Sequence, residues 1–225
     1  INIKMKTILV TGGAGYIGSH TVVELLKNSE YDVIIVDNFS NSNPEIVNRL
    51  YELTKRPIKI YHRDCRDQMD DILSEHKVDG IIHFAAYKAV GESVESPIQY
   101  YDNNINSLLN MLDTAKYFGI KNFVFSSSCS LYGNLKELPA SEESPLSEPE
   151  SPYAYTKLMG ERILQDFKDI GYDIQAYVLN AADYETPQKR ERVVFIGNRI
   201  GKKILYPKPI IQNGKYKTTK DAIAD

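Results

Sequence analysis

The stretch ILVTGGAGYIGSH, residues 8–20, decides the fold of this chain. It opens with a short apolar run that predicts a buried strand. Gly12, Gly15 and Gly18 follow with the spacing G-x-x-G-x-x-G, and apolar residues at helical spacing begin at Tyr16. A strand, a glycine turn and a helix in this order are typical of a unit that brings its backbone close to a dinucleotide pyrophosphate.

The same alternation of apolar runs and helical patterns continues through the first two thirds of the chain. Because the runs are apolar on both faces, we expect parallel strands that are covered by helices on both sides. The predicted fold is therefore α/β, a Rossmann-like doubly wound parallel sheet. Strands are predicted at 7–12, 31–38, 57–62, 78–86 and 121–128, helices at 16–28, 44–56, 67–76, 104–119 and from Tyr153, a loop at 133–152, and a further candidate strand at 172–180.

An acidic residue at the end of the second predicted strand supports dinucleotide binding. Asp37 stands 19 residues after Gly18, where a carboxylate can accept hydrogen bonds from the adenosine ribose. The next residues, Asn38, Phe39 and Ser40, include no base that could receive a 2′-phosphate. The sequence therefore favours NAD over NADP.

The stretch SPYAYTKLMGERILQDF, residues 151–167, places Tyr153 four residues before Lys157. Ser151 is a good N-cap, so both side chains should lie on one face of a helix. A free phenol has a pKa of ~10, and a nearby ammonium favours its ionised form. Such a pair alone is more often an ordinary surface pair. Combined with the glycine turn and with serines such as Ser128 at the carboxyl end of a strand, it predicts a catalytic base.

Composition describes an ordinary globular protein with an uneven charge distribution. The 225 residues carry a formal net charge of −3, with 17 Lys and Arg against 27 Asp and Glu in residues 1–185 and 10 against 3 in residues 186–225. Cys65 and Cys129 are far apart and lack metal-ligand spacing, so we expect neither a metal site nor a disulfide. Without an apolar run of ~20 residues or a secretory signal, we expect a cytoplasmic protein that does not enter the membrane.

Six motifs in order resemble those of the UDP-glucose 4-epimerases, which belong to the extended short-chain dehydrogenase/reductase family. They are TGGAGYIGSH, VDN, FAAYKAVGES, YYDNN, SSSCSLYG and SPYAYTKLMGERIL, and the resemblance covers about residues 5–167. It implies an NAD-dependent isomerase that interconverts UDP-galactose and UDP-glucose through a transient 4-keto sugar. The resemblance is also compatible with a homodimer.

The resemblance assigns Ser128, Tyr153 and Lys157 to catalysis. A dehydratase of the same family would be expected to carry acidic residues directly after the strand-end serine, where this chain has Cys129 and Ser130. That difference favours epimerase chemistry, and another NAD-dependent nucleotide-sugar enzyme of the same family is the alternative. The residues that the resemblance places around NAD are Gly12, Gly15, Tyr16, Ile17, Gly18, Asp37, Asn38, Asp64, Cys65, Phe84, Ala85, Lys88 and Asn103, together with Tyr153 and Lys157. Of these, the resemblance implies that Asp64 and Cys65 flank the adenine and that Lys88 contacts the nicotinamide ribose.

Beyond Phe167 the epimerase pattern stops, and the chain resembles a motif of the DNA (cytosine-5) methyltransferases over about residues 171–208. Glu185 departs from that motif, and the chain has neither a Pro-Cys nucleophile nor a recognisable S-adenosylmethionine loop, so methylation is not expected. The matching residues are Asn180, Ala181, Tyr184, Pro187, Gln188, Arg190 and Arg192.

We therefore expect an NAD-binding domain at 1–170, followed at 171–225 by a methyltransferase-like fragment or an irregular basic tail, without a substrate domain. The start at Ile1, with Met5 as the first methionine, and the abrupt change after Phe167 predict a truncated or chimeric chain with weak or absent UDP-galactose turnover. The alternative from another class is a non-catalytic fusion that binds nucleic acid through its basic tail.

Overall fold

The computed structural model describes residues 5–133, 147–168, 173–180, 191–198, 209–211 and 216. Their centre is one seven-stranded sheet with the order β3-β2-β1-β4-β5-β7-β6. The strands are β1 (Lys6–Thr11), β2 (Tyr31–Asp37), β3 (Lys59–His62), β4 (Gly80–His83), β5 (Asn122–Ser126), β6 (Asp173–Asn180) and β7 (Glu191–Asn198). The first five strands run parallel to one another, as predicted.

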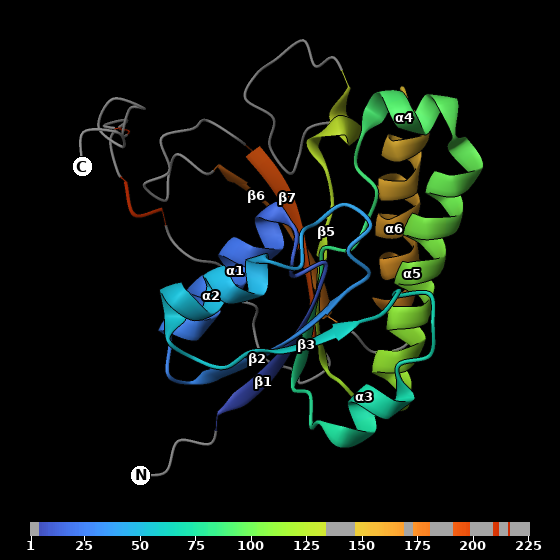
Figure 1. Ribbon diagram of the computed structural model, residues 1–225. Coiled ribbons are helices and arrows are strands. Elements are labelled where there is room, and N and C mark those ends of the chain that lie inside the picture. Colours follow the sequence, from blue (N-terminus) through green and yellow to red (C-terminus); the bar gives the residue numbers. More distant parts are fainter. Residues whose placement is uncertain are drawn as a thin grey trace.

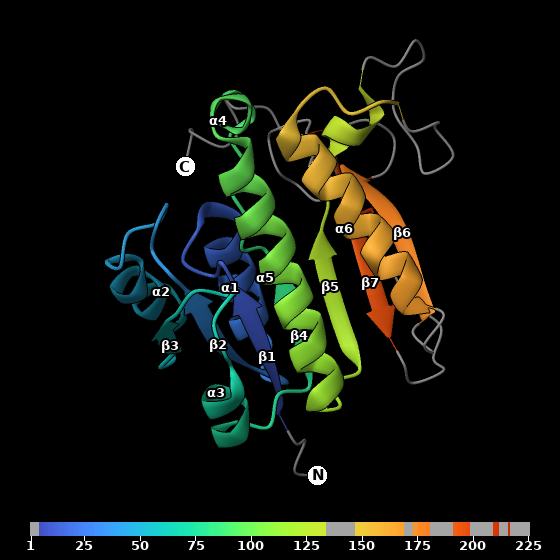
Figure 2. The same ribbon diagram turned by 90° about the vertical axis from the view of Figure 1, so that its right-hand side faces the viewer.

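Helices cover both faces of this sheet. The α1 and α2 helices lie on one face, and α5 and α6 lie on the other (Figure 1). Turning the molecule shows α5 and α6 side by side over the sheet (Figure 2). The helices are α1 (Tyr16–Lys27), α2 (Ile46–Thr54), α3 (Asp70–Glu75), α4 (Val90–Glu95), α5 (Pro97–Tyr117) and α6 (Pro152–Lys168), with a 3₁₀ turn, η1 (Cys129–Tyr132), after β5.

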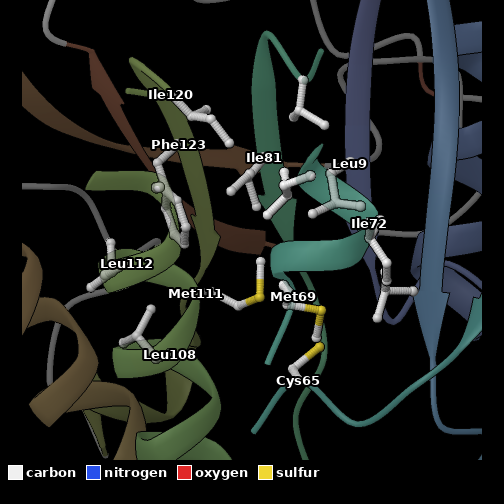
Figure 3. Close-up of a cluster of buried hydrophobic side chains, with 14 of the residues drawn as sticks. Leu9, Cys65, Met69, Ile72, Ile81, Leu108, Met111, Leu112, Ile120 and Phe123 are labelled. Atoms are coloured by element: carbon white, nitrogen blue, oxygen red, sulfur yellow. The ribbon is translucent and has the colours of Figure 1, made fainter. Parts of the chain in front are cut away.

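Strand β2 shows why the apolar runs become central strands. Its residues alternate between the two faces, so Ile34 and Val36 enter one hydrophobic cluster while Val33 and Ile35 enter the other. The larger cluster packs strand residues against α3, α5 and α6. Figure 3 shows it between the sheet and α5, with Leu9, Ile81 and Phe123 from the strands and Leu108, Met111 and Leu112 from α5.

Two elements differ from the sequence-based expectation on the α5 side. Helix α5 begins at Pro97 rather than near residue 104, and α4 precedes it directly. The early turns of α5 bury polar or amphipathic residues such as Tyr100, Asn103 and Asn104, so they lack the apolar periodicity that reveals a helix. Pro97 fits there because the first turn of a helix needs no backbone donor.

The far edge of the sheet is built differently from the rest. Strand β6 confirms the candidate strand at 172–180, but β7 folds back and lies between β5 and β6. It pairs antiparallel with both neighbours, over Asn122–Ser126 of β5 and along all eight residues of β6. The described sheet is therefore parallel through β5 and antiparallel beyond it. Within the described residues, no helix combines the length and the hydrophobicity that crossing a membrane requires.

Candidate functional site

The glycine turn between β1 and α1 has the close packing that its sequence predicts. Gly12 has a φ of +66°, and a Cβ there would lie 2.8 Å from the backbone nitrogen of Ala85. A Cβ on Gly18 would lie 2.2 Å from the carbonyl oxygen of Gly12. Glycine at these positions lets the first turn of α1 sit directly on the loop, with its N–H donors at the edge of the sheet.

Asp37 is buried at the carboxyl end of β2 and holds this turn in place. Its Oδ2 accepts from the backbone N–H of Ala14 at 3.0 Å, and its Oδ1 accepts from the Phe39 N–H at 2.9 Å and the Ser42 hydroxyl at 3.0 Å. A carboxylate offers about four acceptor positions. Asp37 therefore fixes the loop and retains room for about one ligand hydroxyl.

The adenine side predicted from the sequence is an ion-paired loop after β3. The amide of Asn38 donates to Asp64 at 2.9 Å, and Arg66 pairs with the same carboxylate at 2.9 Å. Hydrogen bonds from Arg66 hold the pKa of Asp64 at about 2, so it is ionised at neutral pH. Burial raises the pKa of the Cys65 thiol to about 12, so Cys65 presents a neutral, apolar wall.

The opposite side of the cleft is formed by the segment after β4 and by α5. The backbone N–H of Phe84 donates to the Thr11 carbonyl at 3.1 Å, which places Ala85 against the glycine turn. Lys88 is exposed on the same segment, ahead of α4. Asn103 comes from α5 and is buried, with its side-chain amide donating to Asn104 at 3.0 Å.

Lys157 lies buried under the cleft and is aimed by the end of β5. Its Nζ donates to the Ser126 carbonyl at 2.9 Å and lies 4.8 Å from the ring centroid of Phe125. The same Nζ lies 6.0 Å from the ring centroid of Tyr153, one turn earlier on α6. Burial lowers the pKa of Lys157 to about 8, so it is largely protonated at pH 7. A positive charge therefore sits beside the predicted base.

Ser128 is held so that its hydroxyl proton remains available. Its Oγ accepts from the backbone N–H of Ser130 at 3.2 Å and from the Ser130 hydroxyl at 2.9 Å. These bonds use both lone pairs of the oxygen. The Ser128 O–H is therefore left as a donor toward the cleft that it lines.

A carboxyl group that the sequence analysis missed lies next to this cluster. Glu161 follows Lys157 by one helical turn and accepts a hydrogen bond from the Ser127 hydroxyl. Burial raises the pKa of Glu161 to about 7. Glu161 could have been found from the sequence, because its i+4 spacing from Lys157 places the two side chains on one helix face.

All the site residues predicted from the sequence line a single cleft of about 410 Å³ at the carboxyl edge of the sheet. Parallel sheets of this kind bind ligands at that edge. Residues that the sequence analysis did not single out for the site also line it: Ser40, Asn41, Ser42, Ala86, Tyr87, Val90, Ser107, Cys129 and Ser130. Among the residues that the structure describes, no group of His, Cys, Asp or Glu is arranged to hold a metal ion.

A buried lysine beside a tyrosine, facing the glycine turn of a dinucleotide-binding sheet, defines the class of the extended short-chain dehydrogenases/reductases. A family model gives the assignment within this class. The model described as GDP-mannose 4,6 dehydratase matches residues 9–222, and the chain belongs to this family.

Curated relatives and solved structures are similar to roughly three quarters of the chain. It is 47% identical over 161 residues to the UDP-glucose 4-epimerase of Bacillus subtilis, covering 71% of this chain and 47% of that protein. UDP-glucose 4-epimerase 2 of Arabidopsis thaliana is 47% identical over 166 residues, covering 72% of this chain and 47% of that protein. The chain spans about half the length of the curated relatives it matches.

Solved epimerases share the fold. The UDP-glucose 4-epimerase of Bifidobacterium longum, in complex with NAD+ and UDP, superposes with a TM-score of 0.71 and 48% identity, covering 73% of this chain and 50% of that one. The enzyme of Stenotrophomonas maltophila, with bound NAD and formylated UDP-arabinopyranose, gives a TM-score of 0.71 and 40% identity, covering 74% of this chain and 49% of that one.

The methyltransferase resemblance falls mostly outside the described residues. Asn180 ends β6 and Arg192 lies in β7. The other five matching residues, within 181–190, are outside the described part of the chain, as is most of the loop predicted at 133–152. The comparisons match epimerases and the dehydratase family, and they do not show the methyltransferase resemblance.

Proposed function

We propose that this chain binds NAD in the cleft and carries the reaction centre of a UDP-glucose 4-epimerase. The observation that carries the proposal is the convergence of the glycine turn, Asp37 and the set Ser128, Tyr153 and Lys157 on one cleft. The names of the relatives and the ligands in the titles of the solved structures agree with it. We assign the catalytic and cofactor-binding roles to the residues predicted above.

The residues present fit NAD. A pyrophosphate needs a turn without side chains next to helical N–H donors, and a Cβ at Gly12 or Gly18 would collide with backbone there. The acid at the end of β2 has room for a ribose hydroxyl. Ser40, Asn41 and Ser42 line the cleft beyond it, and none is basic, which supports NAD rather than NADP.

The chemistry follows from the polar groups at the end of β5. Bound NAD would supply a reversible hydride acceptor for carbon 4 of the sugar. Tyr153 takes the proton of the 4-hydroxyl as that hydride leaves, and Lys157 stabilises the negative charge on the phenol oxygen. Ser128 donates its free O–H to the oxygen at carbon 4. Tyr153 would return its proton to the oxygen at carbon 4 once the 4-keto sugar had turned its other face to the cofactor, so the centre would be inverted with no net redox change.

Epimerase chemistry fits this site better than dehydratase chemistry, although the family model takes its description from a dehydratase. Elimination of water needs a further acid beside the strand-end serine. The turn η1, with the sequence CSLY, occupies that place and contains no acidic residue, and Glu161, which hydrogen-bonds Ser127, does not line the cleft. Cys129 and Ser130 line the cleft instead.

The cofactor unit, within residues 1–170, is the part of the chain to which this proposal applies. Residues 171–225, which add β6 and β7 to the same sheet, are assigned no part in the proposed cofactor site. A UDP-sugar is the proposed substrate, and a homodimer is the proposed assembly. Sedimentation velocity would test the dimer, with a monomer at micromolar concentration contradicting it.

Cofactor content after purification tests the proposal. We expect NAD to be released on denaturation, or to bind with a micromolar dissociation constant and raise the melting temperature. Conversion of UDP-galactose should be lost in Tyr153→Phe while NAD binding is kept. A protein that neither contains NAD nor shows a thermal shift with it would overturn the proposal.

Nucleic-acid binding by the basic C-terminal segment is the alternative that the comparisons do not favour. It rests on 10 Lys and Arg against 3 Asp and Glu in residues 186–225. If it were correct, the full chain would bind duplex DNA with an affinity that falls steeply with salt. Fluorescence anisotropy with no binding at 50 mM salt would remove it.

A further inference from the structure

Asn104 is a buried amide on α5 that does not line the cleft, yet all its hydrogen-bonding capacity is used to join the cleft's walls. Its Oδ1 accepts from the backbone N–H of Tyr87 at 2.8 Å and from the Asn103 amide at 3.0 Å. Its Nδ2 donates to the Tyr87 carbonyl at 3.0 Å and to the Thr156 hydroxyl at 3.0 Å. An amide has two donors and two acceptor lone pairs, so it is fully satisfied.

The partners fix which way this amide points. A backbone N–H can only donate and a carbonyl can only accept, so contact with both groups of Tyr87 determines which atom of Asn104 is oxygen and which is nitrogen. The hydroxyl of Thr156 then has a defined direction. It accepts from Asn104 and donates its proton to the Tyr153 carbonyl at 2.7 Å.

Three proposed site elements therefore meet at one side chain. Tyr87 immediately precedes Lys88 on the segment after β4, Asn103 reaches the cleft from α5, and Tyr153 stands in the first turn of α6. Asn104 and Thr156 are both buried, with exposed fractions of 6% and 2%. When such buried groups lose one partner, the remaining donors and acceptors are left without a hydrogen bond, which is costly. The network therefore strongly favours a single arrangement of these side chains.

We propose that Asn104 is a positioning residue that holds the Tyr87–Lys88 segment, Asn103 and the first turn of α6 in one arrangement, with Thr156 as its link to Tyr153. The assignment of these elements to NAD and to the base rests on the proposed function. That Asn104 holds these elements together does not depend on the proposed function, so the positioning role and the link to NAD are tested separately.

Hydrogen–deuterium exchange on the NAD-free protein tests the geometric part. Asn104→Ala should raise exchange at the Tyr87 amide by at least about tenfold and should also raise it in the first turn of α6. Asn110→Ala is the matched control, because Asn110 on the same helix donates to the carbonyls of Cys65 at 2.8 Å and Asp67 at 2.7 Å. That variant should raise exchange only around residues 65–68.

Thr156 variants separate the two arms of the network. Thr156→Val removes the link to α6, so exchange should rise at the start of α6 while the Tyr87 amide stays protected. Thr156→Ser keeps the hydroxyl and should restore wild-type exchange. The two Thr156 variants test the positioning role even if Asn104→Ala does not fold. Equal exchange in Thr156→Val and wild type would overturn the proposal.

Binding measurements then connect the network to the cofactor. Asn104→Ala should weaken NAD binding by about tenfold but AMP binding by less than about twofold, because the altered contacts lie on the nicotinamide side. Asn110→Ala, in contrast, should weaken the binding of both NAD and AMP. Failure of the wild type to bind NAD would overturn the proposed function and leave the exchange result standing. Equal exchange in Asn104→Ala and wild type, or a rise in only one of the two segments, would overturn the positioning role.

Discussion

Strands β1 to β5 and strands β7 and β6 belong to one sheet, but each group joins it in its own way. In the first group each strand is joined through at least one helix to the next strand along the chain, all five strands run parallel, and their carboxyl ends gather at one edge. In the second group two long strands form an antiparallel pair, and the later of them docks on β5. The cleft lies where the parallel strands end, so the candidate site depends chiefly on the first group.

The largest effect should come from the turn that gives the parallel group its ligand-binding edge. Gly18→Ala would place a Cβ 2.2 Å from the Gly12 carbonyl oxygen, which is backbone and cannot rotate away. The turn and α1 must then separate, and we expect NAD affinity to fall about 100-fold or more. Isothermal titration calorimetry measures this, and an affinity within threefold of wild type would show that the close contact is not needed.

A matched pair of isoleucines compares the two groups in packing energy. Ile81 on β4 is 1% exposed, whereas Ile196 on β7 is half-buried. Ile81→Ala should lower the free energy of unfolding by about 3 kcal/mol, and Ile196→Ala by about 1 kcal/mol. Urea unfolding monitored by circular dichroism gives both values. Equal losses would mean that the antiparallel end is as much a part of the cooperative core as the parallel strands.

The pH dependence of stability probes the junction of the two groups, where Glu161 of α6 meets Ser127 after β5. Burial raises the pKa of Glu161 to about 7, so between about pH 4.5 and 7 the folded protein binds more protons there than the unfolded chain. The free energy of unfolding should therefore fall as pH rises through this window. Glu161→Gln should remove roughly 2 kcal/mol of that fall.

Asp166→Asn is the control for this measurement. Asp166 is an exposed acid on the same helix, in an i+4 pair with Arg162. Its removal should leave the pH profile nearly unchanged. The window of Lys157 begins only near pH 8, because burial lowers its pKa to about 8, and it has the opposite sign. An unaltered slope in Glu161→Gln would show that this carboxyl group is not the source.

The smallest effect on stability and NAD affinity is expected at a glycine that lies outside both groups of strands. A Cβ at Gly91 in α4 would meet nothing within 4 Å. Gly91→Ala should therefore stabilise the protein by at most about 1 kcal/mol through helix propensity, and NAD affinity should not change. Differential scanning calorimetry checks it. A clear loss of stability would mean that α4 packs against something beyond the residues described here.

The parallel group could be predicted almost completely from the sequence, because its signals are local patterns of apolar residues and turn residues. Its central strands, such as β1 and β2, are largely apolar on both faces, and the predicted site residues stand at or after strand ends or in the first two turns of a helix. The antiparallel docking of β7 was not predicted, because its pairing partner lies far away along the chain. Asn104 and Glu161 were missed for a related reason: their importance comes from partners on other elements, such as Tyr87, Thr156 and Ser127.

The docking of β7 on β5 also has a consequence for synthesis on the ribosome. The ladder joins Asn122 to Asn198 and Ser126 to Val194, so roughly 70 residues separate the two strands in the chain. At about 5–20 residues per second, the edge of β5 waits on the order of 4–15 s for its second partner. During that time it offers unpaired N–H and C=O groups that can pair with another chain. Slower translation across residues 127–193 should therefore increase aggregation of the nascent protein.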